Sequence, residues 1–185
     1  MTRYQLLQSL LPVLERALVV CNIGAPSQEL YALGDRDENF YMLGTMGLAS
    51  SIGLGLALSQ PRKVVAIDGD GSVLTNLATL ATIANNPADN FTLLIVDNGA
   101  YGSTGDQPTY TSARTSLAEV ARACGCENVR EVDGADAAQA LEEALEGDMM
   151  GVIIAKVAPG SAKVGVIALN PVVMRHRFMG AIGSL

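Results

Sequence analysis

The chain has 185 residues, of which 49% are hydrophobic and 17% charged, and its formal net charge is −7. This length and composition predict one globular domain over residues 1–185 and exclude a disordered or fibrous chain. Nucleic acid is not an expected partner, because phosphate binding needs clustered Lys and Arg, and the sequence has no basic run. No segment has the uninterrupted apolar length of a membrane span or of a signal peptide, which predicts a cytoplasmic protein without membrane contact.

The first third of the chain alternates short apolar runs with turn residues. Leucines at helical spacing predict a first helix, which Pro12 is expected to break or kink. Pro26 and Gly34 are placed to begin and end a second helix. The other expected elements are a strand at 18–21, a strand at 40–43 and a buried helix of small apolar residues at 47–58.

The rest of the chain is more regular. Strands are expected at 64–67, 91–96, 129–132 and 151–157, and a helix between the first two should bury Leu74, Leu77, Ala81 and Ala84. Ser116 and Glu119 form the pattern of a capping box for another helix. Asp133 is expected to cap the next helix, and Asn170-Pro171 to begin a C-terminal one with Met174, Phe178 and Ile182 facing inward.

Strands and helices therefore alternate along the chain, and the strands are apolar without a period of two. That pattern predicts an α/β fold, a doubly wound and mainly parallel sheet with helices on both faces. Ligands of such folds bind beyond the carboxyl ends of the strands. Two polar turns lie at such ends, at residues 68–72 and 97–107.

The chemistry of these turns indicates a magnesium diphosphate site. Asp70 stands between two glycines directly after a strand, and Asn98 ends the next strong strand, so both are expected on one rim of the sheet. Carboxylate and amide oxygens suit Mg²⁺, which fills its remaining positions with phosphate and water. A divalent ion would also let an acidic protein bind an anion.

Other interpretations of the first turn remain open. In a haloacid-dehalogenase-like phosphatase Asp68 would be the nucleophile and Asp70 the acid, although a paired-acid motif further along is missing. The segment from Gly69 to Gly71 could also be an ordinary turn without a functional role. The three cysteines, Cys21, Cys124 and Cys126, lack the spacing of a zinc site and are expected to be free thiols.

Gly69-Asp70-Gly71-Ser72, followed one crossover later by Asp97-Asn98-Gly99, resembles the diphosphate-binding motif of thiamine-diphosphate enzymes. That family has Gly-Asp-Gly and then a pair of Asn residues, so Asp97 is a departure that leaves Asn98 in place. The resemblance implies that Asp70, Asn98 and the carbonyl of Ala100 bind Mg²⁺. It also implies that Gly69, Gly71, Ser72 and Tyr101 contact the cofactor.

Gly44-Thr45-Met46-Gly47 resembles the turn that supports the thiazolium ring in these enzymes. Met46 would be the apolar wedge beneath the cofactor, and the Gly44 carbonyl would accept a bond from the aminopyrimidine. The segments 22–31, 101–109 and 177–179 extend the resemblance to decarboxylases of small anionic 2-oxo acids, namely sulfopyruvate and phosphonopyruvate. Their loop implies substrate contacts from Ser103, Thr104 and Gln107.

By this resemblance the chain is the diphosphate-binding subunit of a carboxy-lyase that converts sulfopyruvate to sulfoacetaldehyde and CO₂ in coenzyme M biosynthesis. The glutamate that activates the cofactor belongs to a pyrimidine-binding domain, which a chain of this length has no room for. A hetero-oligomer with a pyrimidine-binding alpha subunit is therefore expected. The alternatives are a phosphonopyruvate decarboxylase-type or other thiamine-diphosphate subunit, a phosphatase, or a non-catalytic regulatory subunit.

Overall fold

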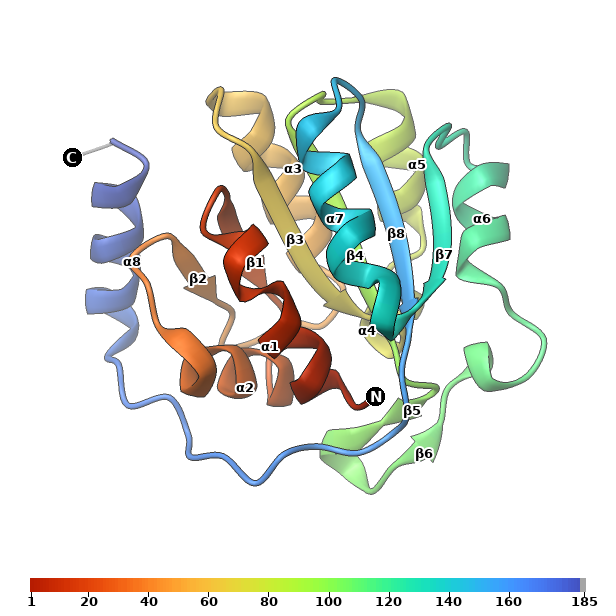
Figure 1. The fold of residues 1–185 in the computed structure, drawn as a ribbon, viewed down its shortest axis with the longest axis horizontal. Coiled ribbons are helices and arrows are strands. Elements are labelled where there is room, and N and C mark those ends of the chain that lie inside the picture. Colours follow the sequence, from red (N-terminus) through yellow and green to blue (C-terminus); the bar gives the residue numbers. More distant parts are fainter. Residues whose placement is uncertain (184–185) are drawn as a thin grey trace.

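The computed structural model describes residues 1–183 (Figure 1). Its helices are α1 (Arg3–Leu14), α2 (Ala25–Gly34), α3 (Ala49–Ser59), α4 (Asp70–Leu74), α5 (Ala78–Asn85), α6 (Leu117–Ala123), α7 (Ala137–Glu146) and α8 (Pro171–Ala181). Its strands are β1 (Leu18–Cys21), β2 (Asn39–Tyr41), β3 (Val64–Gly69), β4 (Phe91–Asp97), β5 (Ala100–Tyr101), β6 (Gln107–Pro108), β7 (Val129–Asp133) and β8 (Gly151–Lys156). Short 3₁₀ turns are η1 (Gly102–Thr104), η2 (Tyr110–Ser112) and η3 (Gly134–Asp136).

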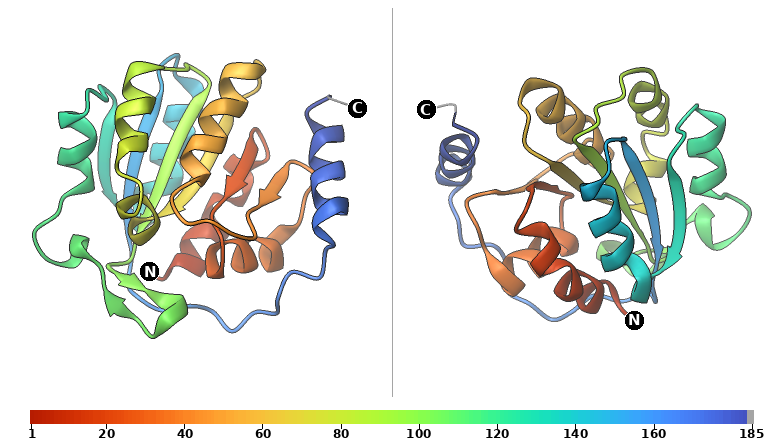
Figure 2. Two further views of the ribbon diagram at one scale, coloured as in Figure 1. Left: turned by 180° about the vertical axis from the view of Figure 1, so that it is seen from behind. Right: turned by 45° about the horizontal axis from the view of Figure 1, so that its top comes forward.

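Six strands form one sheet in the order β2-β1-β3-β4-β8-β7, and every neighbouring pair in it is parallel. Helices α1, α2 and α7 cover one face, while α3, α5 and α6 cover the other (Figures 1 and 2). The expected doubly wound α/β fold is therefore confirmed. Because all strands run the same way, their carboxyl ends share one edge, where ligands of such folds bind.

The sheet separates two hydrophobic layers. Successive residues of a strand point to opposite faces, so Val65 and Ile67 of β3 pack with α1, α2 and α7, whereas Val64 and Ala66 pack with the helices behind. Helix α8 lies outside β2 at the edge of the sheet and buries Met174 and Phe178, as expected (Figure 1). Asn170 caps this helix by accepting from the backbone N–H of Val172.

Some local predictions were wrong. Pro12 does not break α1: it lies in the last turn, and the helix continues to Leu14 before Glu15 caps it. The expected helix between the strands β3 and β4 is two helices. Leu74, Leu77 and Ala84 pack against the core as expected, but the fully buried residues of α5 are Leu80 and Ile83, and Ala81 is not in the core.

Three further local features differ from the expectation. Asp133 ends β7 and precedes a 3₁₀ turn rather than α7, and its side chain makes no capping hydrogen bond. Helix α3 is buried on one side only, because Ile52 and Leu58 are exposed. Strand β2 begins at Asn39 and ends at Tyr41, earlier than expected. No helix among residues 1–183 is long and apolar enough to cross a membrane.

After β8 the chain continues as an extended segment, residues 157–170, which we call the strap. The strap runs along the carboxyl edge of the sheet toward α8 (Figure 1). It is held by the N-terminus: the N–H of Ala158 donates to the carbonyl of Met1 at 2.9 Å, and Arg3 donates to Ser161 Oγ at 2.9 Å. The N-terminus and the strap thus meet beside the carboxyl ends of the strands (Figure 1).

Candidate functional site

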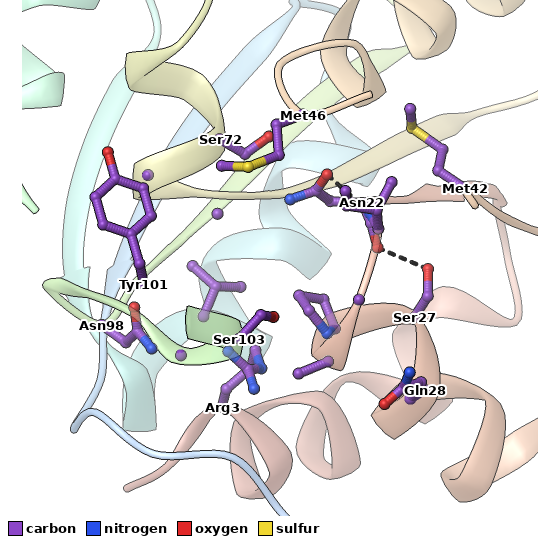
Figure 3. Close-up of a pocket in the computed structure, with 18 of the residues that line it drawn as sticks. Arg3, Asn22, Ser27, Gln28, Met42, Met46, Ser72, Asn98, Tyr101 and Ser103 are labelled. Atoms are coloured by element: carbon purple, nitrogen blue, oxygen red, sulfur yellow. Dashed lines mark hydrogen bonds between the residues drawn. The ribbon is translucent and has the colours of Figure 1, made fainter. Parts of the chain in front are cut away.

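A cavity of about 530 Å³ opens at the carboxyl edge of the sheet (Figure 3). Its walls are the loops that follow β1, β3 and β4, together with the turn around Met46. Two strap residues, Val166 and Ile167, complete one side. The lining residues predicted from the sequence are Met46, Gly69, Asp70, Gly71, Ser72, Asn98, Ala100, Tyr101, Ser103 and Thr104.

Asp70 is the first residue of α4, directly after β3, and only 2% of it is exposed. Its Oδ2 atom accepts hydrogen bonds from Thr109 at 2.5 Å and from Thr111 at 2.9 Å. Burial raises the pKa of the Asp70 carboxyl above its ordinary value; the bond from Thr109 opposes this shift, and the nearby Asp97 charge adds to it. A cation beside Asp70 would reverse that shift, because it stabilises the ionised carboxylate.

Asn98 lies in the turn that follows β4. Its Oδ1 atom accepts from the backbone N–H of Ala100 at 3.2 Å, and Gly99 takes a positive φ of 66° between them. The Nδ2 atom of Asn98 is buried and has no partner among the described residues. An amide oxygen has two lone pairs, so Oδ1 can hold the turn and still bind a ligand.

These residues fit a magnesium diphosphate. They supply one carboxylate, one side-chain amide and a backbone carbonyl, which are hard oxygen donors too few to enclose a metal alone. Within residues 1–183, no group of three or more His, Cys, Asp or Glu is arranged to hold a metal ion without other donors. The orphaned Nδ2 of Asn98 indicates that this wall is built to meet a polar group.

The glycine at position 71 gives the site its shape. A Cβ atom there would lie 2.3 Å from Cε1 of Tyr101 and 3.2 Å from Cγ2 of Thr109. Only a residue without a side chain lets the loop after β4 close over the start of α4. The Ser72 side chain already has a hydrogen-bond partner within the chain, because its Oγ accepts from the N–H of Gly47 at 2.7 Å.

That bond ties the Met46 turn to α4. Asn76 strengthens the link by donating from Nδ2 to the carbonyl of Gly47 at 2.8 Å. Thr45 and Gly47 both have positive φ, 66° and 82°, which folds the turn tightly and projects Met46 to the cavity beside Ser72 (Figure 3). Met46 remains 39% exposed.

Two predicted site residues lie away from the cavity wall. Among the described lining residues neither Gly44 nor Gln107 occurs. Gln107 instead bonds to Thr104, accepting from its hydroxyl at 2.8 Å and donating to its carbonyl at 2.8 Å. Arg177, within the segment that extends the family resemblance, pairs with Asp35 and Asp37 and does not line the cavity.

Sequence reasoning missed a buried ion pair at the cavity. Arg3 donates from Nε to Glu29 Oε2 at 2.8 Å and from Nη2 to Oε1 at 3.0 Å, and Glu29 is fully buried. Glu29 also accepts from the backbone N–H of Ala162 in the strap. Of the described residues that line the cavity, Arg3 alone is basic. The one available signal was the polar Ser27-Gln28-Glu29 within an otherwise apolar helix.

Asp68 does not fit a phosphatase nucleophile. It is fully buried, it does not line the cavity, and its Oδ2 has no partner among the described residues. Burial raises the pKa of its carboxyl to about 6. A nucleophile must reach its substrate, and this carboxylate faces the interior of the protein instead.

The chain is similar to known proteins of one enzyme family. The family model described as "Thiamine pyrophosphate enzyme, C-terminal TPP binding domain" matches residues 28–155. The sulfopyruvate decarboxylase subunit beta of Methanococcus maripaludis is 49% identical over 98% of each chain. The phosphonopyruvate decarboxylase of Streptomyces viridochromogenes is 43% identical over 96% of this chain and 45% of its own length.

A solved structure shares the fold. The thiamine diphosphate-dependent 4-hydroxybenzoylformate decarboxylase of Rhodococcus jostii RHA1 superposes with a TM-score of 0.69 at 21% identity. The superposition covers 88% of this chain and 33% of that one.

Proposed function

The chain belongs to the thiamine pyrophosphate (thiamine diphosphate) enzymes, and on this premise we propose that residues 1–185 form the diphosphate- and magnesium-binding domain of a decarboxylase. Its substrate is sulfopyruvate, which it converts to sulfoacetaldehyde and CO₂ in coenzyme M biosynthesis. The observation that carries the proposal is the rim that joins Asp70, Asn98 and Met46 around one cavity. When bound, thiamine diphosphate supplies the electron sink for decarboxylation.

The chain's own residues bind and orient. We propose that Asp70, Asn98 and the carbonyl of Ala100 hold Mg²⁺, and that the backbone N–H groups of Gly71 and Ser72 face the phosphates. Positive charge is needed here because the chain is acidic and the diphosphate is anionic. Tyr101 packs over Gly71 and closes this wall of the cavity, where the diphosphate would bind.

Met46 acts by shape. Its turn is fastened to α4 through Gly47 and Ser72, so the side chain is held at the cavity beside the diphosphate position. We propose that it supports the thiazolium ring from below, with Gly44 offering its carbonyl to the aminopyrimidine. Ser103 and Thr104 lie on the same cavity in the loop after Tyr101, which suits contacts with a small anionic substrate, with Gln107 holding Thr104.

A second chain is part of the proposal. The matched region is less than half of the Streptomyces phosphonopyruvate decarboxylase, so that enzyme carries a further part within its own chain. Here we propose that a pyrimidine-binding alpha subunit supplies it, in a cytoplasmic hetero-oligomer. Exposed apolar side chains beside the cavity suit such an interface: Leu43, Met46, Leu48 and Ile52.

The test compares CO₂ release from sulfopyruvate by the purified chain and by the chain mixed with the alpha subunit, both with Mg²⁺ and thiamine diphosphate. Activity is expected only in the mixture. Full activity of the chain alone would contradict the two-subunit arrangement. Phosphonopyruvate is the matched control substrate, because it differs in the anionic group, and a preference for it would replace sulfopyruvate in the proposal.

A further inference from the structure

Asp97 stands where the family motif has an Asn, and it is almost completely buried at the end of β4. A neutral Asn needs only hydrogen bonds there, whereas a carboxylate needs a compensating charge, because an unpaired buried charge is costly. The side chains around Asp97 show how this chain meets that need.

Lys156 supplies the charge. It ends β8 and stands directly beside Asp97 in the register of the two parallel strands. Its Nζ atom lies 2.5 Å from Asp97 Oδ2 and 3.9 Å from Glu131 Oε2. Lys156 is about one-third exposed while Asp97 is buried, so the ammonium reaches inward to the carboxylate from the surface.

The other oxygen of Asp97 organises the cavity. Its Oδ1 atom accepts from the backbone N–H of Gly99 at 3.1 Å, which stabilises the turn that presents Asn98 and Ala100. The same Oδ1 accepts from the hydroxyl of Thr111 at 2.8 Å. Asp97 therefore fixes the backbone on which two of the three proposed metal ligands stand.

Thr111 extends this arrangement to the third ligand, because its hydroxyl also lies 2.9 Å from Asp70 Oδ2. A hydroxyl carries a single hydrogen and serves one carboxylate at a time. Asp97 and Asp70 thus share one donor, and the position of either carboxylate depends on the other. A continuous set of contacts runs from Lys156 through Asp97 and Thr111 to Asp70.

We infer that Lys156 is a positioning residue for the metal site: by holding the Asp97 carboxylate it fixes the turn of Asn98 and Ala100 and, through Thr111, the carboxylate of Asp70. This inference rests on the proposed function, because it takes those three residues as the metal ligands. Residues that orient metal ligands typically change metal affinity by roughly 10- to 100-fold when they are replaced.

The experiment measures Mn²⁺ binding by electron paramagnetic resonance in the chain assembled with its alpha subunit, with thiamine diphosphate present. In Lys156→Met the Asp97 carboxylate loses the ammonium that holds it in place, and we expect Mn²⁺ to bind about tenfold more weakly. Adding Asp97→Asn to Lys156→Met should restore the affinity, since an amide oxygen keeps the bond from Gly99 without needing a counter-charge.

Lys63→Met is the matched control. Lys63 donates to the carbonyl of Gly147 away from the cavity, so its loss removes the same charge and should leave Mn²⁺ affinity unchanged. Equal affinity of Lys156→Met and the wild type, or no recovery in the double variant, would overturn the inference while the proposed function stands. A wild-type complex that binds neither Mn²⁺ nor thiamine diphosphate would overturn both.

Discussion

The backbone of Gly71 lies so close to the ring of Tyr101 that a Cβ atom would stand 2.3 Å from Cε1. Gly71→Ala should therefore displace the Tyr101 loop and lower the affinity for thiamine diphosphate by about tenfold or more, because overpacking costs roughly 1–3 kcal/mol. Isothermal titration of the assembled protein measures this. Gly55→Ala adds the same methyl group in open space and should bind normally; equal affinities in both variants would contradict the prediction.

Asp70 should be required for cofactor retention and not for folding. Asp70→Ala removes the only carboxylate proposed to bind Mg²⁺, so cofactor and metal should be lost on gel filtration. The metal-free chain should stay folded, because the removed group is buried and has a raised pKa. Asp148→Ala, at an exposed acid, is the control. Retention of cofactor by Asp70→Ala would rule out the assignment.

Truncation of the Met46 side chain should impair the enzyme more than a substitution that keeps its volume. Met46→Leu keeps most of the volume and should be mild, whereas Met46→Ala should lower kcat of the assembled enzyme by at least several-fold. Mn²⁺ affinity should change little in either, since the methionine touches no metal ligand in the proposal. The half-exposed Met149 offers the control Met149→Ala. Unchanged kcat in Met46→Ala would defeat the wedge.

Asp68 should make the stability of the metal-free chain depend on pH. Its folded pKa is about 6, above the ordinary 3.8, because burial penalises the charged form. The folded state therefore holds the proton more tightly, so this contribution is complete below about pH 4 and is lost as the pH rises through 6. The loss amounts to about 3 kcal/mol.

Asp68→Asn cannot ionise and should lack this dependence. Urea unfolding of the wild type and of Asp68→Asn between pH 4 and 7 gives the unfolding free energy of each. In the difference between the two, the contributions of all other titrating groups cancel. That difference should grow in favour of the variant as the pH rises. A constant difference across this range would show that Asp68 titrates alike in the folded and unfolded chain.

Removing one partner of the Arg3–Glu29 ion pair should lower the unfolding free energy more than removing both. Arg3→Met leaves a fully buried carboxylate without its partner and should lower the unfolding free energy by roughly 3–5 kcal/mol. The double variant Arg3→Met, Glu29→Leu should be less destabilised, because no buried charge remains. Arg16→Met, which breaks only exposed pairs, should cost at most about 1 kcal/mol. Denaturant unfolding distinguishes these cases.

The sequence predicts those parts of the fold that depend on local patterns. Apolar runs located the strands, and the caps Ser116 and Asn170 marked the starts of α6 and α8. The motif predicted that Asp70 and Asn98 lie on one edge of the sheet, because parallel strands end at the same edge, and both residues line the cavity there. Where tertiary packing decides, the prediction was incomplete: it found Leu77 and Ala84 but missed Leu80, which α5 buries completely because that side faces the sheet.

The rest of the site depends on contacts between distant segments. Thr109 and Thr111 bond to Asp70 only because the hairpin of β5 and β6 folds back over α4. Lys156 meets Asp97 through the register of β8 against β4, which periodicity does not fix. In the sequence, Arg3 is a single polar residue at the start of a helix. Its ion pair and its hydrogen bond become apparent only in the fold, where α2 and the strap lie beside it.

The bond from Arg3 to Ser161 joins residues 158 positions apart. A chain growing on the ribosome can bury its first strands early, but the wall of the cavity made by the strap closes only after the last strand has entered the sheet between β4 and β7. Contacts of such sequence separation form late, since loop closure must precede them. A nascent chain therefore completes this wall of the cavity only after the strap has been synthesised.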